Sequence, residues 1–244
     1  DRWLPGKLSR DISLLQETAS IGIVVSNFVR FVHKTGERLS DQFAFYPELK
    51  DMASVPLGRG ALKLVGNAFD AVINMGEIPA YHSALTYRRE VIGQSRFLPV
   101  VRDSNGTIIV LEDVDFFLSI CRKTEIAFNC RPMMEMRRHR NNSTREYDSL
   151  TYAKLRSFER LRNSVQLDAS RQRVLARRIA REWANVGYWH LQTRRWGAAG
   201  AAFLRTGLQG RPLAAIKGFL ILARSMVGGS GYQSSFLFAM LGGG

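Results

Sequence analysis

Three carboxylates, Glu112, Asp113 and Asp115, lie inside an otherwise apolar run, IVLEDVDFFLSI, at residues 109–120. β-Branched residues precede Glu112 and helical spacing follows it, so these acids are expected in the first turn of a helix. Acids at that place have a structural explanation, because they complement the partial positive charge of a helix N-terminus. The chemical alternative is a carboxylate at a strand end, beside a ligand crevice, that acts as a general base toward a hydroxyl.

A basic cluster follows in the sequence MRRHRNNS at residues 136–143 and contains Arg137 and His139. Guanidinium groups bind phosphate oxygens through paired hydrogen bonds, and a histidine adds a hydrogen bond or a metal ligand. Such a cluster can neutralise a diphosphate. A solvated basic loop explains the same residues without any ligand.

The elements that must position these residues are predicted from periodicity. Apolar spacing predicts one helix within residues 2–19 and another over residues 60–75. β-Branched residues predict a strand from Ile21, and residues 125–139 are expected to form an extended pair. The segment from Ile78 is expected to be a short strand or loop that leads into a helix. This mixture of strands and helices predicts an α/β layer.

The pattern changes near Ser149, after which helical periodicity continues to about Leu222. Within it, residues 196–223 are expected to form a helical hairpin of the tetratricopeptide type. The glycine-rich end of the chain is expected to be a flexible tail. We therefore predict three parts: residues 1–148, 149–227 and 228–244.

The formal net charge of +14 is distributed unevenly. Residues 1–136 contain 16 Lys and Arg against 16 Asp and Glu, so the whole excess lies in residues 137–244. The two cysteines, Cys121 and Cys130, form no C-x-x-C pair, which favours structural thiols in a reducing compartment. No secretory signal, membrane-spanning run, P-loop or G-x-S-x-G motif is evident, and we expect a cytoplasmic location.

Three segments, taken in order, resemble the family-2 glycosyltransferases. They are DRWLPGKLSRDISLL from Asp1, IPAYHSALTYRREVIG from Ile78, and LEDVDFFLSI from Leu111 followed by RRHRNNS. The resemblance covers about residues 1–143. It implies an α/β fold of the GT-A, Rossmann-like type, here followed by an all-α helical extension. The family's nucleotide-binding half would precede Asp1, so the chain is expected to be an incomplete GT-A domain that is inactive by itself.

The resemblance implies transfer of a sugar, of the hexosyltransferase type, from a nucleotide-diphosphate sugar to an acceptor hydroxyl, with inversion. Asp113 matches the catalytic base of the family and would take the acceptor proton, while Glu112 would orient the site or bind the acceptor. Arg137 and His139 match an R-x-H element and would approach the leaving group.

Further site residues are implied by the same resemblance. Ser83 and Arg88 would line the floor of the site. A divalent cation, Mg²⁺ or Mn²⁺, would hold the diphosphate, with Asp1 at the edge of the metal-binding turn. The acceptor is expected to be a saccharide or a lipid-linked sugar of cell-wall or polysaccharide synthesis.

Other classes of function stay open. The interleaving of basic residues with Trp183, Tyr188, Trp189 and Trp196 fits phosphate binding with base stacking, as in a nucleic-acid-binding protein. The helical hairpin fits a protein-interaction module without catalysis. The basic part also fits attachment to an anionic membrane surface, at the inner face of the membrane.

Overall fold

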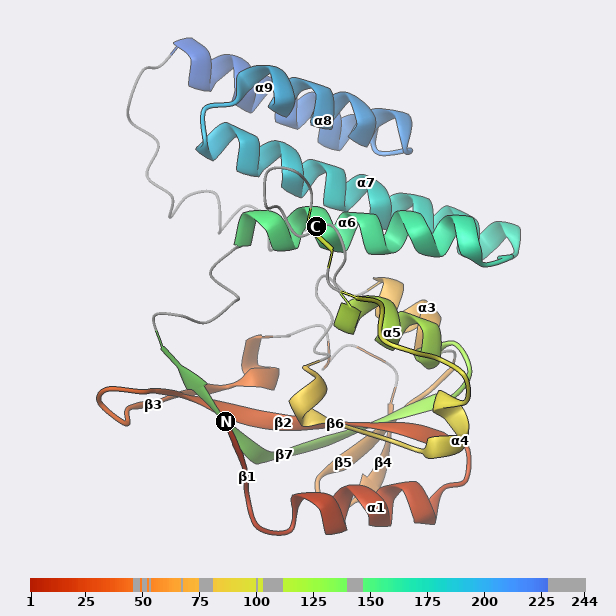
Figure 1. The fold of residues 1–244 in the computed structure, drawn as a ribbon. Coiled ribbons are helices and arrows are strands. Elements are labelled where there is room, and N and C mark those ends of the chain that lie inside the picture. Colours follow the sequence, from red (N-terminus) through yellow and green to blue (C-terminus); the bar gives the residue numbers. More distant parts are fainter. Residues whose placement is uncertain are drawn as a thin grey trace. The chain divides into compact units, whose positions relative to one another are not determined.

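The computed structural model describes residues 1–45, 54–66, 68–74, 81–99, 101–102, 112–139 and 147–227, with the single positions 49 and 52. Contacts divide the chain into two units, Asp1–Val174 and Leu175–Gly244. In the described residues, the first unit is a mixed α/β structure and the second is helical (Figure 1).

Two long parallel strands form the centre of the sheet in the first unit. They are β2 (Ile21–Val32) and β7 (Glu125–Arg138). The first eight residues of β2 are buried and rich in β-branched side chains, as expected of a parallel strand that is covered on both faces. The strand predicted from Ile21 is therefore confirmed.

The extended pair predicted for residues 125–139 is wrong, because β7 is one continuous strand. Ser26 of β2 pairs with Asn129, and the next residue of β2 pairs with Pro132. The two residues between Asn129 and Pro132 form a bulge in β7. The strand therefore continues through these two residues, although they interrupt its sequence pattern.

Short strands line the outer edges of the central pair, and all of them run antiparallel to their neighbours. Beside β2 and β7 lie β6 (Leu85–Tyr87), β3 (Arg38–Asp41), β5 (Ala61–Leu64), β4 (Ser54–Gly58) and β1 (Arg2–Trp3). β6 and β3 pair with β2, β5 and β1 pair with β7, and β4 continues the sheet from β5.

The helix predicted over residues 60–75 is only partly right. Its first part is β5, in which Leu62 pairs with Phe128 of β7, and its last part is α3 (Ala68–Asn74). Long-range pairing overrides the local helical spacing, because β7 offers an edge that β5 can complete. In the segment predicted from Ile78, the described residues begin at Tyr81. There the prediction is confirmed, since a 3₁₀ turn, η2 (His82–Ala84), and β6 lead into α4 (Arg89–Ile92).

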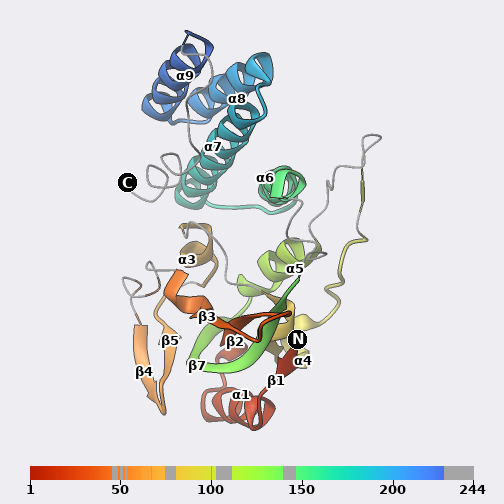
Figure 2. The same cartoon turned by 90° about the vertical axis from the view of Figure 1, so that its left-hand side faces the viewer.

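Helices cover both faces of the sheet. α1 (Lys7–Glu17) lies on one face, whereas α3 and α5 (Glu112–Cys121) lie on the other (Figures 1 and 2). Both the N-terminal helix and the helix that begins at Glu112 were expected from the sequence. α6 (Tyr147–Ser164) packs against α5.

A buried ion pair holds α1 to the sheet. Lys7 and Asp11 are one helical turn apart on α1, both side chains are fully buried, and Lys7 Nζ lies 2.7 Å from Asp11 Oδ2. Asp11 also accepts hydrogen bonds from Ser26 Oγ on β2, Thr86 Oγ1 on β6 and Asn129 Nδ2 on β7. A single carboxylate therefore ties one helix to three strands.

Helical structure fills the described part of the chain from Tyr147 onward, as predicted for the stretch after Ser149. After α6 come α7 (Ala169–Gln192), α8 (Trp196–Leu208) and α9 (Pro212–Val227). α8 and α9 form a hairpin where the sequence predicts one. Contacts divide the chain after Val174, so α6 belongs to the first unit.

Glycines let the three helices of the second unit approach closely. The ring of Phe203 on α8 lies so near Gly187 of α7 and Gly218 of α9 that a Cβ on either glycine would be within 2.5 Å or 2.3 Å of it. Phe203 is fully buried and also meets Tyr188 edge to face. The tail predicted over residues 228–244 lies outside the described residues. In the described part of the chain, no helix is both long and apolar enough to cross a membrane.

We expect Lys7→Met to lower the free energy of unfolding by about 3–5 kcal/mol, because it leaves the Asp11 carboxylate buried without its cation. Arg156→Met is the matched control. Arg156 Nη1 also lies 2.7 Å from its partner, Glu159, but that pair is exposed, so its loss should cost less than about 1 kcal/mol. Urea unfolding of both variants measures the difference. Equal costs would contradict a stabilising role for the buried pair.

Candidate functional site

Asp113 lies in the first turn of α5 and is partly buried. The imidazole of His82 connects η2 to α5, since its Nε2 lies 3.0 Å from the backbone oxygen of Asp113. A carbonyl oxygen only accepts, so Nε2 carries the proton. His82 Nδ1 lies 3.0 Å from the hydroxyl of Tyr87, within hydrogen-bonding distance. His82 thus fixes the start of α5 against β6.

Aromatic rings form the wall around this histidine. The rings of Phe97 and Phe116 stack with their centroids 4.0 Å apart. His82 meets Phe97 and Phe116 at centroid distances of 4.8 Å and 5.6 Å, and Tyr87 meets Phe116 edge to face. Asp113 therefore adjoins this aromatic cluster through the contact of its backbone oxygen with His82.

This environment favours the neutral form of Asp113. Burial is the largest effect and raises the pKa of its carboxyl above 3.8, and the charge of Glu112 adds to the increase. The amide of Val114, which donates to Asp113 Oδ1 at 2.8 Å, and the nearby His82 oppose it. Burial, together with the charge of Asp113, also raises the pKa of the Tyr87 phenol far above its usual value of 10. A carboxylate with a raised pKa is a stronger base, which is a common property of catalytic groups.

The three acids of the opening stretch have different surroundings. Asp115 is bound to α6, because its Oδ2 accepts from Ser157 Oγ at 2.8 Å and its Oδ1 accepts from Arg160 Nε at 3.2 Å. Its role is therefore structural. Glu112 is partly exposed beside Asp113, which leaves these two acids as the pair that can face a ligand.

Two other predicted residues follow His82 along the chain. Ser83 is exposed, and its backbone oxygen accepts a hydrogen bond from Trp3 Nε1 at 2.7 Å. The guanidinium of Arg88 donates to the backbone oxygens of Leu15 and Ile21, where α1 ends and β2 begins. Arg88 therefore has a structural task in the fold, and its predicted contact with a substrate remains a prediction.

Asp1 and Arg137 come together from distant parts of the sequence. The amide of Arg137, near the end of β7, donates to Asp1 Oδ1 at 2.8 Å. Arg137 and His139 are both exposed. The predicted R-x-H element and the first acid of the chain therefore share one end of β7.

β1 links the two groups of predicted residues. Asp1 binds Arg137, and Trp3, two residues later, binds the backbone of Ser83, which is next to the histidine that holds Asp113. Two residues of extended chain span about 7 Å. A continuous series of contacts thus leads from the R-x-H element to the start of α5.

The described residues do not fit a divalent cation by themselves. Among them, no three His, Cys, Asp or Glu side chains converge as metal ligands. Asp1 contributes one carboxylate, one oxygen of which already accepts the amide of Arg137.

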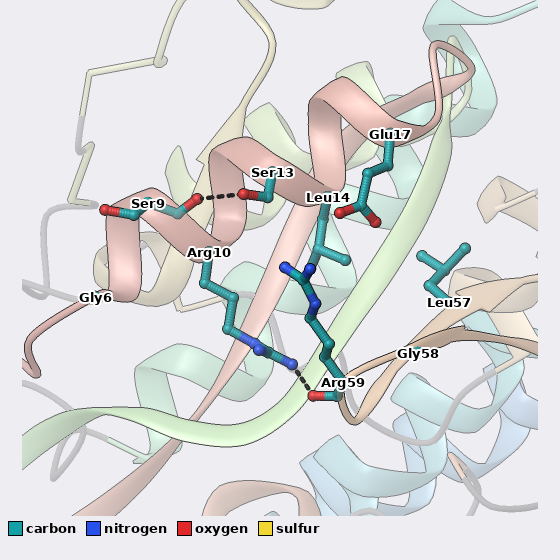
Figure 3. A pocket seen from close by; sticks show the side chains of 9 residues that line it. All are labelled: Gly6, Ser9, Arg10, Ser13, Leu14, Glu17, Leu57, Gly58 and Arg59. Atoms are coloured by element: carbon teal, nitrogen blue, oxygen red, sulfur yellow. Dashed lines mark hydrogen bonds between the residues drawn. The ribbon is translucent and has the colours of Figure 1, made fainter.

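A hollow of about 250 Å³ lies elsewhere, between α1 and the turn that joins β4 to β5 (Figure 3). Its lining includes Ser9, Arg10, Glu17 and Arg59. Arg10 is already engaged, since it donates to the backbone oxygen of Arg59 and to Asn129 Oδ1. The hollow is on the α1 face of the sheet, whereas Asp113 belongs to the layer on the opposite face (Figure 1).

Sequence reasoning missed His82 and Tyr87, although both lie in the segment YHSALTYRRE from which Ser83 and Arg88 were chosen. The residue type could have indicated His82, because the chain has only four histidines and this one lies directly before Ser83. Its partner is a backbone oxygen, which no sequence pattern reveals.

Comparison with known proteins found no relative: no family model, no curated protein and no solved structure matches the chain. What the chain does must therefore be inferred from this geometry and from the order of its motifs.

Asp113→Asn is expected to make the protein more stable at neutral pH. Because the pKa of Asp113 is raised in the folded state, the folded chain keeps this proton to a higher pH than the unfolded chain. Wild-type stability therefore falls as the pH rises from 3.8 through the raised pKa, and the asparagine variant escapes that loss. Urea unfolding across this pH range should show a difference that vanishes on acidification. A difference that does not change with pH would contradict the assignment.

Proposed function

We propose that the chain is the acceptor side of a family-2-like, GT-A glycosyltransferase and that Asp113 is its general base. The observation that carries the proposal is the partly buried carboxyl of Asp113, with its raised pKa, at the start of a helix that His82 holds in place. The parallel pair β2 and β7, covered by helices on both faces, supports an α/β layer of this type.

Asp113 accepts the proton of the acceptor hydroxyl as that oxygen attacks the anomeric carbon of the donor sugar. The new carbon–oxygen bond forms while the bond from the sugar to the diphosphate breaks, and the diphosphate leaves with the electron pair. A base with a raised pKa binds the proton more strongly, which supports this role at neutral pH. Glu112, next in the chain, orients or binds the acceptor.

Arg137 and His139 approach the leaving diphosphate. Their exposure at the end of β7 leaves them accessible to a ligand, and guanidinium groups bind phosphate oxygens well. Asp1 fixes the backbone of Arg137 through its amide. Contact through β1 and η2 couples the position of this cationic end of β7 to that of Asp113.

The packing of the helical part weakens the nucleic-acid alternative. Trp183 and Tyr188 are buried, and the guanidinium of Arg205 lies 4.4 Å from the centre of the Trp183 ring. Base stacking needs an accessible ring face, and these two rings are occupied by neighbouring side chains.

The test compares Asp113→Asn with Asp115→Asn in the full natural chain. Asp113→Asn should lower the rate of sugar transfer by about 10²–10⁴-fold, because it removes the base. Its fold should persist, since asparagine can still accept the Val114 amide. Asp115→Asn should instead lower stability and leave the rate per folded molecule near wild type, because Asp115 binds Ser157 and Arg160.

The rate is measured as release of nucleotide diphosphate from a panel of nucleotide-diphosphate sugars, with saccharide and lipid-linked acceptors. Transfer by Asp113→Asn near the wild-type rate would overturn the assignment of the base. An effect of equal size in Asp115→Asn would point to a structural cause for both.

A further inference from the structure

An exposed apolar surface covers the α8–α9 hairpin on the side turned away from α7. Phe203 and Ala199 face α7, whereas other large apolar side chains of both helices are exposed. The exposed fractions are high for side chains of this kind: Leu204 56%, Leu208 78%, Leu213 80%, Ile216 54% and Leu220 67%. On α9 the spacing of Leu213, Ile216 and Leu220 by three and four residues places them on one stripe. We call these five residues the hairpin surface.

Cations flank the hairpin surface. Lys217 lies four residues after Leu213, and Arg224 lies four residues after Leu220, so both are beside the stripe on α9. Both are exposed.

Neither helix of the hairpin contains an Asp or a Glu. Glu182 is the last acidic residue of the sequence, and six Lys and Arg follow it. Glu182 itself is buried in a pair with Arg178, with 2.7 Å between the charged atoms. A helical surface that combines exposed leucines and isoleucine with cations and without acids is typical of helices that lie in the interface of an anionic membrane.

We propose that the hairpin surface docks the protein onto an anionic phospholipid membrane, with α9 lying in the plane of the headgroups. The leucines and isoleucine enter the boundary of the acyl chains, and Lys217 and Arg224 contact anionic headgroups. The proposal goes beyond sugar transfer and does not require it, since it rests on the second unit alone.

Charge argues against two other occupants. A second copy in a two-fold arrangement would bring Lys217 and Arg224 near their own equivalents, with no acid on either hairpin to pair them. A nucleic acid would use the cations but would leave the apolar stripe in water. An anionic membrane matches both the apolar and the basic components of the hairpin surface.

The first test is flotation of the full chain with vesicles. The chain should bind vesicles that contain phosphatidylglycerol and should bind pure phosphatidylcholine vesicles far less. Lys217→Gln with Arg224→Gln should weaken binding by roughly thirtyfold, which corresponds to about 1 kcal/mol for each cation. Ile216→Ser with Leu220→Ser should weaken it by about tenfold or more, because exposed apolar side chains lose their burial in the membrane.

Matched controls change similar residues in the first unit. Leu8 and Ile12 on α1 are also exposed apolar residues, and Lys34 and Arg122 are exposed cations. Leu8→Ser with Ile12→Ser, and Lys34→Gln with Arg122→Gln, should leave vesicle binding unchanged. Circular dichroism checks that all variants remain folded.

Three results would overturn the proposal. The first is absence of binding to phosphatidylglycerol vesicles. The second is an equal loss of vesicle binding in the α9 variants and the control variants. The third is vesicle binding that the α9 variants do not weaken. Tight binding to a duplex oligonucleotide without vesicle binding would assign the cations to nucleic acid. A dimer in solution that Ile216→Ser with Leu220→Ser dissociates would assign the surface to a second copy. Activity of the full natural chain is measured separately, so failure of docking leaves the proposed base untouched.

Discussion

The carboxylate of Asp11 is the constraint on which the first unit depends. It is fully buried on α1 and receives hydrogen bonds from Lys7, from β2, from β6 and from β7. A buried charge with every oxygen satisfied permits only one arrangement of these elements, because any shift would leave a charge in an apolar interior. The centre of the sheet and its N-terminal helix are thereby fixed together.

The same constraint reaches the candidate site through the residues just before α1. The ammonium of Lys7 lies 4.6 Å from the centre of the Trp3 ring, and Trp3 donates to the backbone of Ser83. β6, which carries Tyr87, is held by Thr86 to Asp11. Tyr87 and His82 then position the start of α5. A series of contacts thus connects the Asp11 network to the start of α5 through β6 and η2.

Much of this arrangement was predictable from sequence where the signal was local and periodic. α1, the strand from Ile21, the helix at Glu112 and the helical part after Ser149 all follow spacing that a short window contains. β5 and the uninterrupted β7 were missed, because their form depends on pairing with each other across more than sixty residues. The bulge after Asn129 is defined only by its pairing with β2, so the sequence of β7 alone does not reveal it.

The site likewise combines features that the sequence indicates with features that depend on long-range contacts. The resemblance singled out Asp113, whereas the spacing of the acids does not separate it from Asp115, because both are expected in one helical turn. What separates them is the environment: Arg160 and Ser157 bind Asp115, whereas Asp113 stands beside His82 and an aromatic wall. His82 and the network around Asp11 depend on contacts between distant segments, and their partners are spread over four elements of the chain.

The most direct measurement is a titration of the Asp113 carboxyl carbon by nuclear magnetic resonance in the intact chain, with the signal assigned by its absence in Asp113→Asn. The account predicts a midpoint above 3.8, because partial burial beside the aromatic wall disfavours the charged form. A midpoint at or below 3.8 would mean that Asp113 is an ordinary solvated carboxylate at a helix N-terminus, and its assignment as the base would then be contradicted.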